Sequence, residues 1–254
     1  LRDDLKLKSI KDGCSQGACG TCTIIINGKA TRACVMNTKR ANGMNIVSVE
    51  GLNDSEKEAF VYAFGSKGAV QCGFCIPGMV MAGKALIDRN PNPTEADIKE
   101  ALKGNICRCT GYKKIIEAID LVAQILRGDK KIDTELEKGD NFGVGSNAFR
   151  IDVREKVLGY GEYCDDVEME DMLHVSAVRS KYPRARILDI DFSEALKLDG
   201  VVAVYTAEDV PNIKVGHIQQ DWDVIIAKGG ITRFMGDALC LVVAESEEIL
   251  KKAK

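Results

Sequence analysis

The stretch GCSQGACGTC, residues 13–22, places three cysteines and three glycines within ten positions. The spacing of Cys14, Cys19 and Cys22 is C-x4-C-x2-C, which is the plant-type arrangement for a [2Fe-2S] cluster. The glycines supply positive φ angles and let backbone N–H groups approach sulfur, which a Cβ atom would hinder. A fourth cysteine, Cys34, follows after eleven residues. The pattern predicts a four-thiolate cluster site, and four buried free cysteines are the alternative.

The residues between Cys22 and Cys34 predict a β-hairpin. TCTIIING has the apolar, β-branched composition of a strand and ends in Asn27-Gly28, a dipeptide typical of two-residue hairpin turns. KATRAC then forms the returning strand and brings Cys34 back towards the loop. Plant ferredoxins have a much longer gap before the last cysteine, so the pattern predicts a related variant.

A second group of cysteines lies further along the chain. QCGFC contains Cys72 and Cys75, and NICRC contains Cys107 and Cys109. Four thiolates are also a common structural zinc site, so zinc is the competing interpretation. The plant-type loop upstream favours a second [2Fe-2S] cluster, because two clusters in neighbouring small domains form an electron relay.

The segments around the second group predict four helices. Asn53 or Asp54 is suited to cap the first and Thr94 the third, and Pro77 suits a first helical turn. Gly104 is expected to end the third helix. The cysteine pairs precede the second and fourth helices, whose N-terminal N–H groups would stabilise an anionic cluster. The four helical segments are NDSEKEAFVYAFG, PGMVMAGKALIDR, TEADIKEALKG and YKKIIEAIDLVAQILRG.

Bulk properties exclude several classes of protein. The 254 residues suffice for about two or three domains. With 45% apolar and 29% charged residues, the composition is that of a folded soluble protein. The formal charge of -3, without a basic stripe, disfavours nucleic acid as a partner, and the longest apolar runs are too short to span a membrane. Concentration of eight of the ten cysteines in two groups disfavours a disulfide framework.

The second half of the chain differs from the first in composition and in hydrophobic periodicity. Residues 128–152 are charged and non-periodic, as in a linker, and the GVG within them lacks the context of a dinucleotide-binding motif. Beyond the linker, MLHVSAVRS, ARILDIDF, GVVAVYTAEDVP and DALCLVVAES predict strands, and SEALKL a short helix capped by Ser193. The remaining thiols and imidazoles have no visible catalytic partner and are expected to be structural: Cys164, Cys240, His174 and His217.

GCSQGACGTC…C, QCGFCIPGMVM and GNICRCTGY together resemble the iron–sulfur portion of the molybdenum hydroxylases, the xanthine dehydrogenase and aldehyde oxidase family. The resemblance covers residues 1 to about 126, and VLGYGEYCDDVE onwards resembles the hammerhead domain that opens the molybdenum-binding part. It implies an α+β fold with four parts. These are a β-grasp, ferredoxin-like domain (1–51), a four-helix [2Fe-2S] domain (52–127), a linker (128–152) and an α/β hammerhead domain (153–254). The missing first strands and the helical last residues lead us to expect truncation at both ends.

The resemblance also implies roles for particular residues. Cys14, Cys19, Cys22 and Cys34 would bind the ferredoxin-like cluster, and Cys72, Cys75, Cys107 and Cys109 the helical-domain cluster. Gln71 and Cys109 would lie next to the molybdopterin, and catalytic residues would lie outside this stretch.

The implied reaction is water-derived hydroxylation of a small molecule at molybdenum. Two electrons then pass singly through the two [2Fe-2S] clusters to an external acceptor or a separate flavin subunit. A xanthine dehydrogenase-like enzyme is favoured, and an aldehyde oxidoreductase or a stand-alone electron-transfer subunit are the alternatives. The reducing demands of the clusters predict the cytoplasm.

Overall fold

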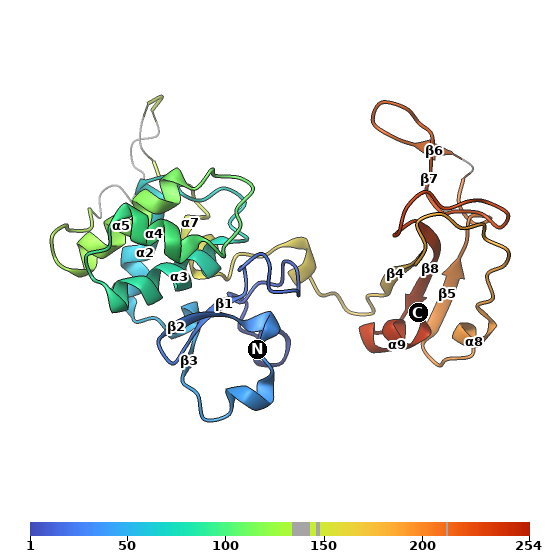
Figure 1. Ribbon diagram of the computed structural model, residues 1–254, viewed down its shortest axis with the longest axis horizontal. Coiled ribbons are helices and arrows are strands. Elements are labelled where there is room, and N and C mark those ends of the chain that lie inside the picture. Colours follow the sequence, from blue (N-terminus) through green and yellow to red (C-terminus); the bar gives the residue numbers. More distant parts are fainter. Residues whose placement is uncertain (134–142, 146–147, 212) are drawn as a thin grey trace. The chain divides into compact units, whose positions relative to one another are not determined.

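The computed structural model describes residues 1–133, 143–145, 148–211 and 213–254. The chain divides into two compact units, residues 1–162 and 163–254, and the N-terminus lies in the first and the C-terminus in the second (Figure 1). Part of the predicted linker, residues 134–142 and 146–147, lies outside the described residues. The two units are considered separately below.

The first unit begins with a three-stranded antiparallel sheet. Its order is β2-β1-β3, with β1 at Thr23–Ile26, β2 at Lys29–Arg32 and β3 at Ile46–Val47. The turn at Asn27-Gly28 has φ angles of 48° and 77°, so the predicted hairpin is confirmed. Short helical segments complete this part of the unit: α1 at Arg2–Leu5 and 3-10 helices at Ala33–Val35, Thr38–Ala41 and Val49–Gly51.

The central strand β1 is buried along its whole length. Successive side chains of a strand point to opposite faces, so its two faces meet different surroundings. Ile25 belongs to the core formed with the helices, whereas Ile24 and Ile26 belong to a smaller core beneath the sheet. The uninterrupted TIII sequence therefore reflects a strand between two apolar layers.

Four helices follow the sheet, as predicted: α2 at Asp54–Ser66, α3 at Ile76–Arg89, α4 at Glu95–Leu102 and α5 at Lys113–Leu126 (Figure 1). Asn53 and Thr94 form capping boxes with the residues three positions on, and Pro77 lies in the first turn of α3. Gly104 lies two residues beyond the end of α4. The apolar faces of all four helices form one core, which includes Phe60 and Phe64 of α2.

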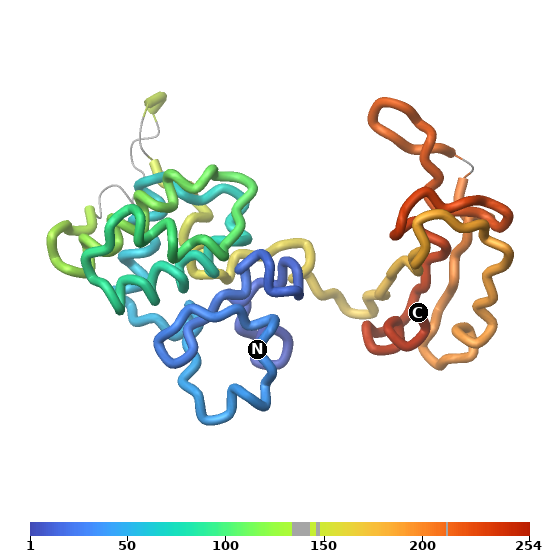
Figure 2. Tube along the Cα trace, in the orientation of Figure 1, coloured from blue at the N-terminus to red at the C-terminus, as the bar shows by residue number. Residues whose placement is uncertain are grey.

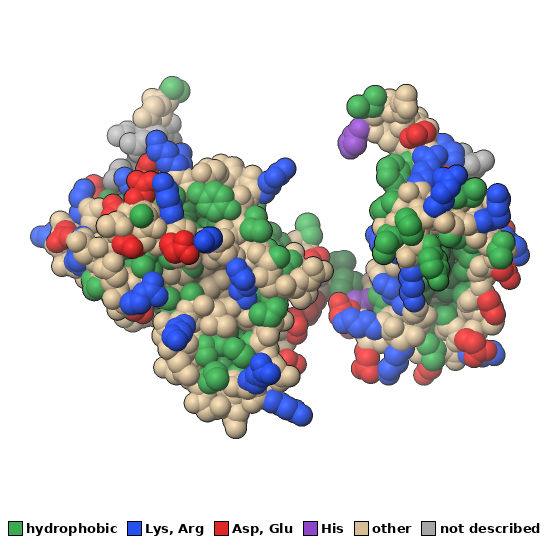
Figure 3. Space-filling model, viewed as in Figure 1, with side chains coloured by type: hydrophobic (Ala, Val, Ile, Leu, Met, Phe, Trp, Pro, Cys, Tyr) green, Lys and Arg blue, Asp and Glu red, His purple; other side chains and the backbone are tan. Residues whose placement is uncertain are grey.

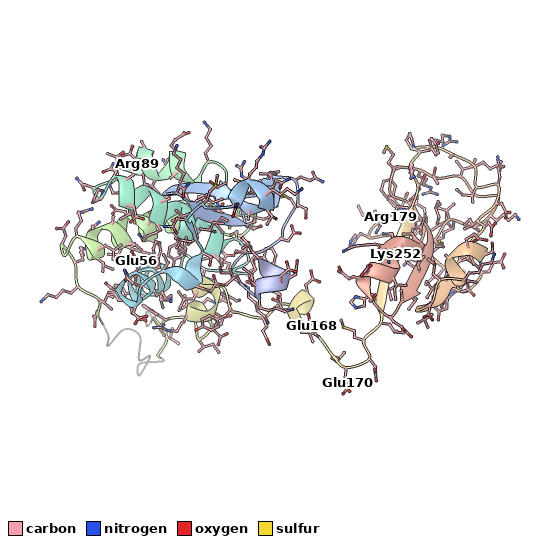
Figure 4. All side chains as sticks on the ribbon, turned by 90° about the horizontal axis from the view of Figure 1, so that it is seen from below. Glu56, Arg89, Glu168, Glu170, Arg179 and Lys252 are labelled. Carbon is pink, nitrogen blue, oxygen red and sulfur yellow. The ribbon has the colours of Figure 1, made fainter. Side chains whose placement is uncertain are left out.

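Charges at the helix ends support this arrangement. Glu56 lies in the first turn of α2 and Arg89 in the last turn of α3, where each complements the helix dipole (Figure 4). Glu56 also pairs with Lys84 of α3 at 2.9 Å, which links the two helices across their half-buried flank.

A short helix from beyond the predicted linker packs on the four-helix core. Helix α7, Val153–Leu158, contacts α2 and α3 and buries Val153 and Val157 among their apolar side chains. The chain around α7 runs along the helices before it leaves the first unit (Figure 2). The boundaries predicted from the sequence stay predictions, but the chain from Val153 to Glu162 lies within the first compact unit.

The second unit contains an antiparallel sheet of order β4-β8-β5, with β4 at His174–Arg179, β5 at Val201–Tyr205 and β8 at Ala238–Ala244. Its central strand β8 carries the apolar run ALCLVVA, as expected of a buried strand. Helices α8, Ser193–Leu196, and α9, Glu247–Ala253, pack against this sheet. A small ribbon of β6, Lys214–Val215, and β7, Trp222–Asp223, and a 3-10 helix at Cys164–Asp166 complete the unit.

Two local predictions for the second unit were wrong. The segment ARILDIDF forms one isolated bridge, from Arg186 to Ile231, because its backbone groups bond to the loop at residues 229–232 rather than to the sheet. Ser193 begins α8 rather than capping it, and its N–H donates to the Asp191 carboxylate at 2.9 Å. An alternating pattern indicates a strand only where a neighbouring strand is free to pair.

The surface charge is mixed. On the face shown in Figure 3, Lys and Arg side chains alternate with Asp and Glu over both units, in keeping with the formal charge of -3. Within the described ranges, no helix combines the length and the apolar character needed to cross a membrane.

Replacing Gly78 by alanine tests the contact between α3 and the first cysteine loop. A Cβ at Gly78 would lie 2.5 Å from the carbonyl oxygen of Gly20 and 2.9 Å from that of Thr21, and both are backbone atoms. We expect Gly78→Ala to lower the free energy of unfolding by about 1–3 kcal/mol, as overpacking does. In Gly83→Ala, the control, the new methyl meets side-chain carbons of Ile119 at 3.2 Å rather than backbone atoms. Urea unfolding should show a loss in the first variant only, and equal midpoints would contradict the packing described.

Candidate iron–sulfur sites

The loop at residues 13–22 brings Cys14 and Cys19 together. The backbone N–H groups of Gln16 and Cys19 each donate to the Cys14 Sγ at 3.4 Å. These donors, with the Cys19 side chain, lower the pKa of the Cys14 thiol to about 6. Gly17 and Gly20, at φ 75° and 72°, turn the loop so that its amides face sulfur. The loop is therefore built to hold a thiolate, as a cluster ligand requires.

The hairpin brings the other two thiols of this group together. Cys34 lies in the 3-10 helix directly after β2, and the Ala33 N–H donates to the Cys22 carbonyl at 3.1 Å. Burial raises the pKa of Cys22, and the neighbouring Cys34 thiol raises it further. Cys22 is buried and Cys34 is exposed at the surface. The four predicted thiols thus form two contacting pairs on one loop and its adjoining hairpin.

The second group forms a closed set of neighbours. Cys75 interacts with Cys72 and Cys107, and Cys109 interacts with the same two residues. Burial is the main reason why the pKa of Cys75 lies far above its usual value, and the thiols of Cys107 and Cys72 add to it. A buried thiol with a raised pKa, such as Cys75, resists ionisation on its own, and a bound cationic iron core would stabilise its thiolate.

Two side chains after the C-x-C motif support Cys107. The Thr110 hydroxyl donates to the Cys107 Sγ at 3.1 Å, and the Cys107 N–H donates to the Tyr112 hydroxyl at 2.8 Å. Burial acts to raise the pKa of Cys107, but the hydrogen bonds, that of Thr110 foremost, lower it overall. Sequence reasoning missed Thr110 and Tyr112. The sequence signal for them is CTGY, residues 109–112, in which a threonine and a tyrosine follow the last cysteine closely enough to form hydrogen bonds within the loop.

The second and fourth helices both begin within one residue of their predicted starts, but they begin at different distances from the cysteines. Cys75 is itself the N-cap of α3, so the first free N–H groups of that helix begin at a predicted ligand. Helix α5 begins at Lys113, four residues after Cys109, and its N-cap Tyr112 has a φ of 69°. The favourable helix end is therefore immediate at Cys75 and more distant at Cys109.

The two cysteine groups are connected by direct backbone contacts. The Ile106 N–H donates to the carbonyl oxygen of Cys19 at 2.8 Å, and Ile106 directly precedes Cys107. The Asn105 side chain, only 6% exposed, donates to the Gly20 carbonyl at 2.9 Å. One hydrogen bond thus joins the backbone of Cys19, a predicted ligand of the first group, to the residue directly before Cys107, a predicted ligand of the second.

Glycine makes this approach possible. A Cβ at Gly20 would lie 2.3 Å from the carbonyl oxygen of Gly104 and 2.9 Å from the Asn105 Cα. Both distances are shorter than any ordinary Cβ contact, and Gly20 also has a positive φ. The glycine of the first loop therefore serves two purposes, the turn itself and the contact with the second loop.

The residues predicted to contact molybdopterin, Gln71 and Cys109, are both exposed. The Gln71 carbonyl accepts hydrogen bonds from Arg150 at 3.0 Å and Lys156 at 3.4 Å. A surface pocket of about 880 Å³ lies between α4, α5 and the loop that carries Ile106 and Tyr112. The roles predicted for Gln71 and Cys109 stay predictions.

The remaining thiols and imidazoles lie in the second unit. Cys240 is buried in β8, as predicted for a core residue, and Cys164 is exposed in its 3-10 helix. His174 lies in β4, and His217 is exposed in the loop between β6 and β7. Among the residues that the structure describes, no group of three or more His, Cys, Asp or Glu has the geometry to hold a single metal ion.

Comparison with known families matches two parts of the chain. Residues 48–120 match the family model of a [2Fe-2S] binding domain. Residues 158–254 match that of the a/b hammerhead domain of aldehyde oxidase and xanthine dehydrogenase. Most of the helical part of the first unit and the whole of the second unit therefore lie within the two domains that the resemblance implied.

Individual relatives extend these matches. The aldehyde oxidoreductase of Megalodesulfovibrio gigas is 37% identical over 97% of this chain, which spans 29% of that protein. The nicotinate dehydrogenase small FeS subunit of Eubacterium barkeri is 47% identical over 47% of this chain and 76% of that subunit. The solved aldehyde oxidoreductase from Desulfovibrio gigas superposes with a TM-score of 0.79 at 32% identity, covering all of this chain and 30% of that one.

The fold and the cysteine groups define an iron–sulfur protein joined to a hammerhead domain. With the relatives above, the chain belongs to the molybdenum hydroxylase family, the family of xanthine dehydrogenase and aldehyde oxidase. The α+β fold and [2Fe-2S] binding by the helical domain are confirmed.

Thr110→Val tests the support of Cys107 without changing its shape. Loss of the hydroxyl donor leaves more negative charge on the Cys107 sulfur, which disfavours addition of an electron. We expect a lower reduction potential for the helical-domain cluster in an electron paramagnetic resonance (EPR) redox titration. Thr31→Val is the control, because its hydroxyl bonds to the exposed Lys29 carbonyl. An unchanged potential in Thr110→Val would show that this hydrogen bond does not affect the reduction potential of the cluster.

Proposed function

We propose that the first unit holds two [2Fe-2S] clusters and relays single electrons from a molybdopterin site to an external acceptor. The observation that carries the proposal is the hydrogen bond from the Ile106 N–H to the Cys19 carbonyl, at 2.8 Å. It connects the two predicted sites by backbone, with no side chain in between. The proposed ligands are Cys14, Cys19, Cys22 and Cys34 for one cluster and Cys72, Cys75, Cys107 and Cys109 for the other.

The donor set fits the proposed clusters. Each site offers four thiols, and in each at least one sulfur accepts hydrogen bonds, from amides at Cys14 and from a hydroxyl at Cys107. Iron–sulfur clusters supply one-electron transfer, and the surrounding hydrogen bonds and burial set their potentials. The chain positions the sites, excludes water from Cys22 and Cys75, and leaves Cys34 and Cys109 near the surface. These exposed thiols are the points at which electrons would leave and enter.

The chain would act within a larger molybdopterin-dependent oxidoreductase. Bound molybdopterin would supply hydroxylation of a substrate carbon with oxygen from water, and Gln71 and Cys109 are the residues proposed to face it. Partners would be the rest of the molybdopterin-binding part and an electron acceptor or separate flavin subunit. The reducing state that such thiolates need favours the cytoplasm.

An aldehyde is the first substrate to test. The relative that aligns over 97% of this chain is an aldehyde oxidoreductase, and the alignment includes the passage from the iron–sulfur part to the hammerhead domain. The sequence of residues 216–237 favours a xanthine dehydrogenase-like enzyme instead. Turnover of the complete enzyme on an aldehyde, with xanthine as the alternative substrate, distinguishes the two.

Metal and sulfide analysis tests the proposed clusters. The anaerobically purified chain should contain about four irons and four acid-labile sulfides, as two [2Fe-2S] clusters require. Zinc in place of iron, without sulfide, would contradict the proposal and support a zinc-stabilised module.

Cys75→Ser tests the partition of the ligands. Since the two sites share no ligand, we expect about half of the iron and one of two EPR signals to be lost, while the ferredoxin-like signal remains. Cys240→Ser is the matched control, because Cys240 is also buried but lies in β8 of the second unit. Loss of both signals in Cys75→Ser would show that the ligand sets are not separate.

A further inference from the structure

The segment of residues 148–162, which we call the strap, is fixed on helix α2 at its start. The Phe149 ring lies against Gly65, where a Cβ would be 2.6 Å from the ring, and 6.0 Å from the Tyr62 ring between centroids. Further along, Arg154 pairs with Glu58 of α2. The strap is therefore attached to α2 at Phe149 and again at Arg154.

Lys156 of the strap lies over the loop that carries Cys72 and Cys75. The aliphatic part of Lys156 covers Gly73, where a Cβ would be 2.7 Å from three carbon atoms of the lysine side chain. Gly73 has a φ of 87° and stands between Cys72 and Cys75. Any other residue there would both strain the backbone and displace Lys156.

Two cations of the strap bond to the carbonyl that precedes Cys72. Arg150 and Lys156 both donate to the Gln71 oxygen, at 3.0 and 3.4 Å. Asp152 bridges the two cations, with oxygens 2.8 Å from the Arg150 Nε and 2.8 Å from the Lys156 Nζ. These contacts, that of Arg150 foremost, lower the pKa of Asp152 to about 2. At neutral pH two positive charges and one negative charge therefore stand beside Cys72.

We propose that this charge triad, Arg150, Asp152 and Lys156, raises the reduction potential of the helical-domain cluster. The inference rests on the ligand assignment proposed above. Reduction adds a negative charge to a cluster, so a net positive charge beside a ligand favours the reduced form. The Lys156 side chain is only 19% exposed, which limits the screening of its charge by water. The triad comes from beyond the domain that holds the ligands, so the chain leading to the hammerhead domain adjusts the relay.

Two substitutions with opposite expected signs test the proposal. Lys156→Met keeps the aliphatic cover of Gly73 and removes a positive charge, and Asp152→Asn removes the negative one. In EPR redox titrations of the cluster-loaded full chain, we expect Lys156→Met to shift the reduction equilibrium towards the oxidised form by about threefold. That is about 28 mV downwards for a one-electron couple, at 59 mV per tenfold change. Asp152→Asn should shift the potential upwards.

Three controls separate charge from structure. Lys156→Arg keeps the charge and should keep the potential. Arg154→Met removes a strap cation that pairs with Glu58 on α2, and it should also leave the potential unchanged. The ferredoxin-like cluster of every variant should titrate as in the unchanged chain.

Several results would overturn the proposal. They are unchanged potentials in both test variants, shifts of the same sign in both, or loss of the helical-domain signal in Lys156→Met, which would make the lysine a structural residue. If the unchanged chain showed no [2Fe-2S] signal, the ligand assignment itself would fail. The two failures are thus distinguishable.

Discussion

The contact between the loop at Gly20 and the turn at Gly104 and Asn105 determines how the two cysteine groups are placed. Here backbone meets backbone: a Cβ on Gly20 would lie 2.3 Å from the Gly104 oxygen. Asn105 and Ile106 then satisfy the carbonyls of Gly20 and Cys19 with hydrogen bonds of 2.9 and 2.8 Å. Strand β1 begins at Thr23, directly after the loop that contains Gly20, and α4 ends at Leu102, two residues before Gly104. The contact therefore lies where the sheet and the helices meet.

The protein prepares each group of thiols with dipoles and hydrogen bonds rather than with many charges. Amide N–H groups face Cys14, a hydroxyl faces Cys107, and Cys75 is the N-cap of α3. Burial works against these effects at Cys22 and Cys75, whose pKa values are raised. Each site therefore combines a thiol with a raised pKa and a thiol with a lowered one. The stability of such a site depends on a bound cationic core. The full charges near these sites belong to Arg150, Asp152 and Lys156 of the strap, whose partly exposed side chains are also solvated by water.

The sequence predicted the local elements well because local chemistry determines them. Asn27-Gly28 specifies its turn, Asn53 and Thr94 their caps, and the cysteine spacing the two groups. Contacts between distant segments carried no such signal. The sequence around Gly73 gives no sign that Lys156 covers it. The alternation of ARILDIDF likewise does not reveal that its backbone forms hydrogen bonds with a loop. Gly20 was predicted from its loop, but no sequence signal indicated that Gly20 and Gly78, which lies within α3, are needed for close packing between segments.

The proposed four-thiolate clusters lie close together on the two sides of the Gly20 contact. EPR of the fully reduced, cluster-loaded chain is the decisive measurement, because two paramagnetic centres at short range broaden and split each other's signals. We expect two [2Fe-2S] signals that interact when both clusters are reduced and do not interact when only one is reduced. Two signals that stay independent at full reduction, or a single signal, would show that the clusters are not held together at this contact.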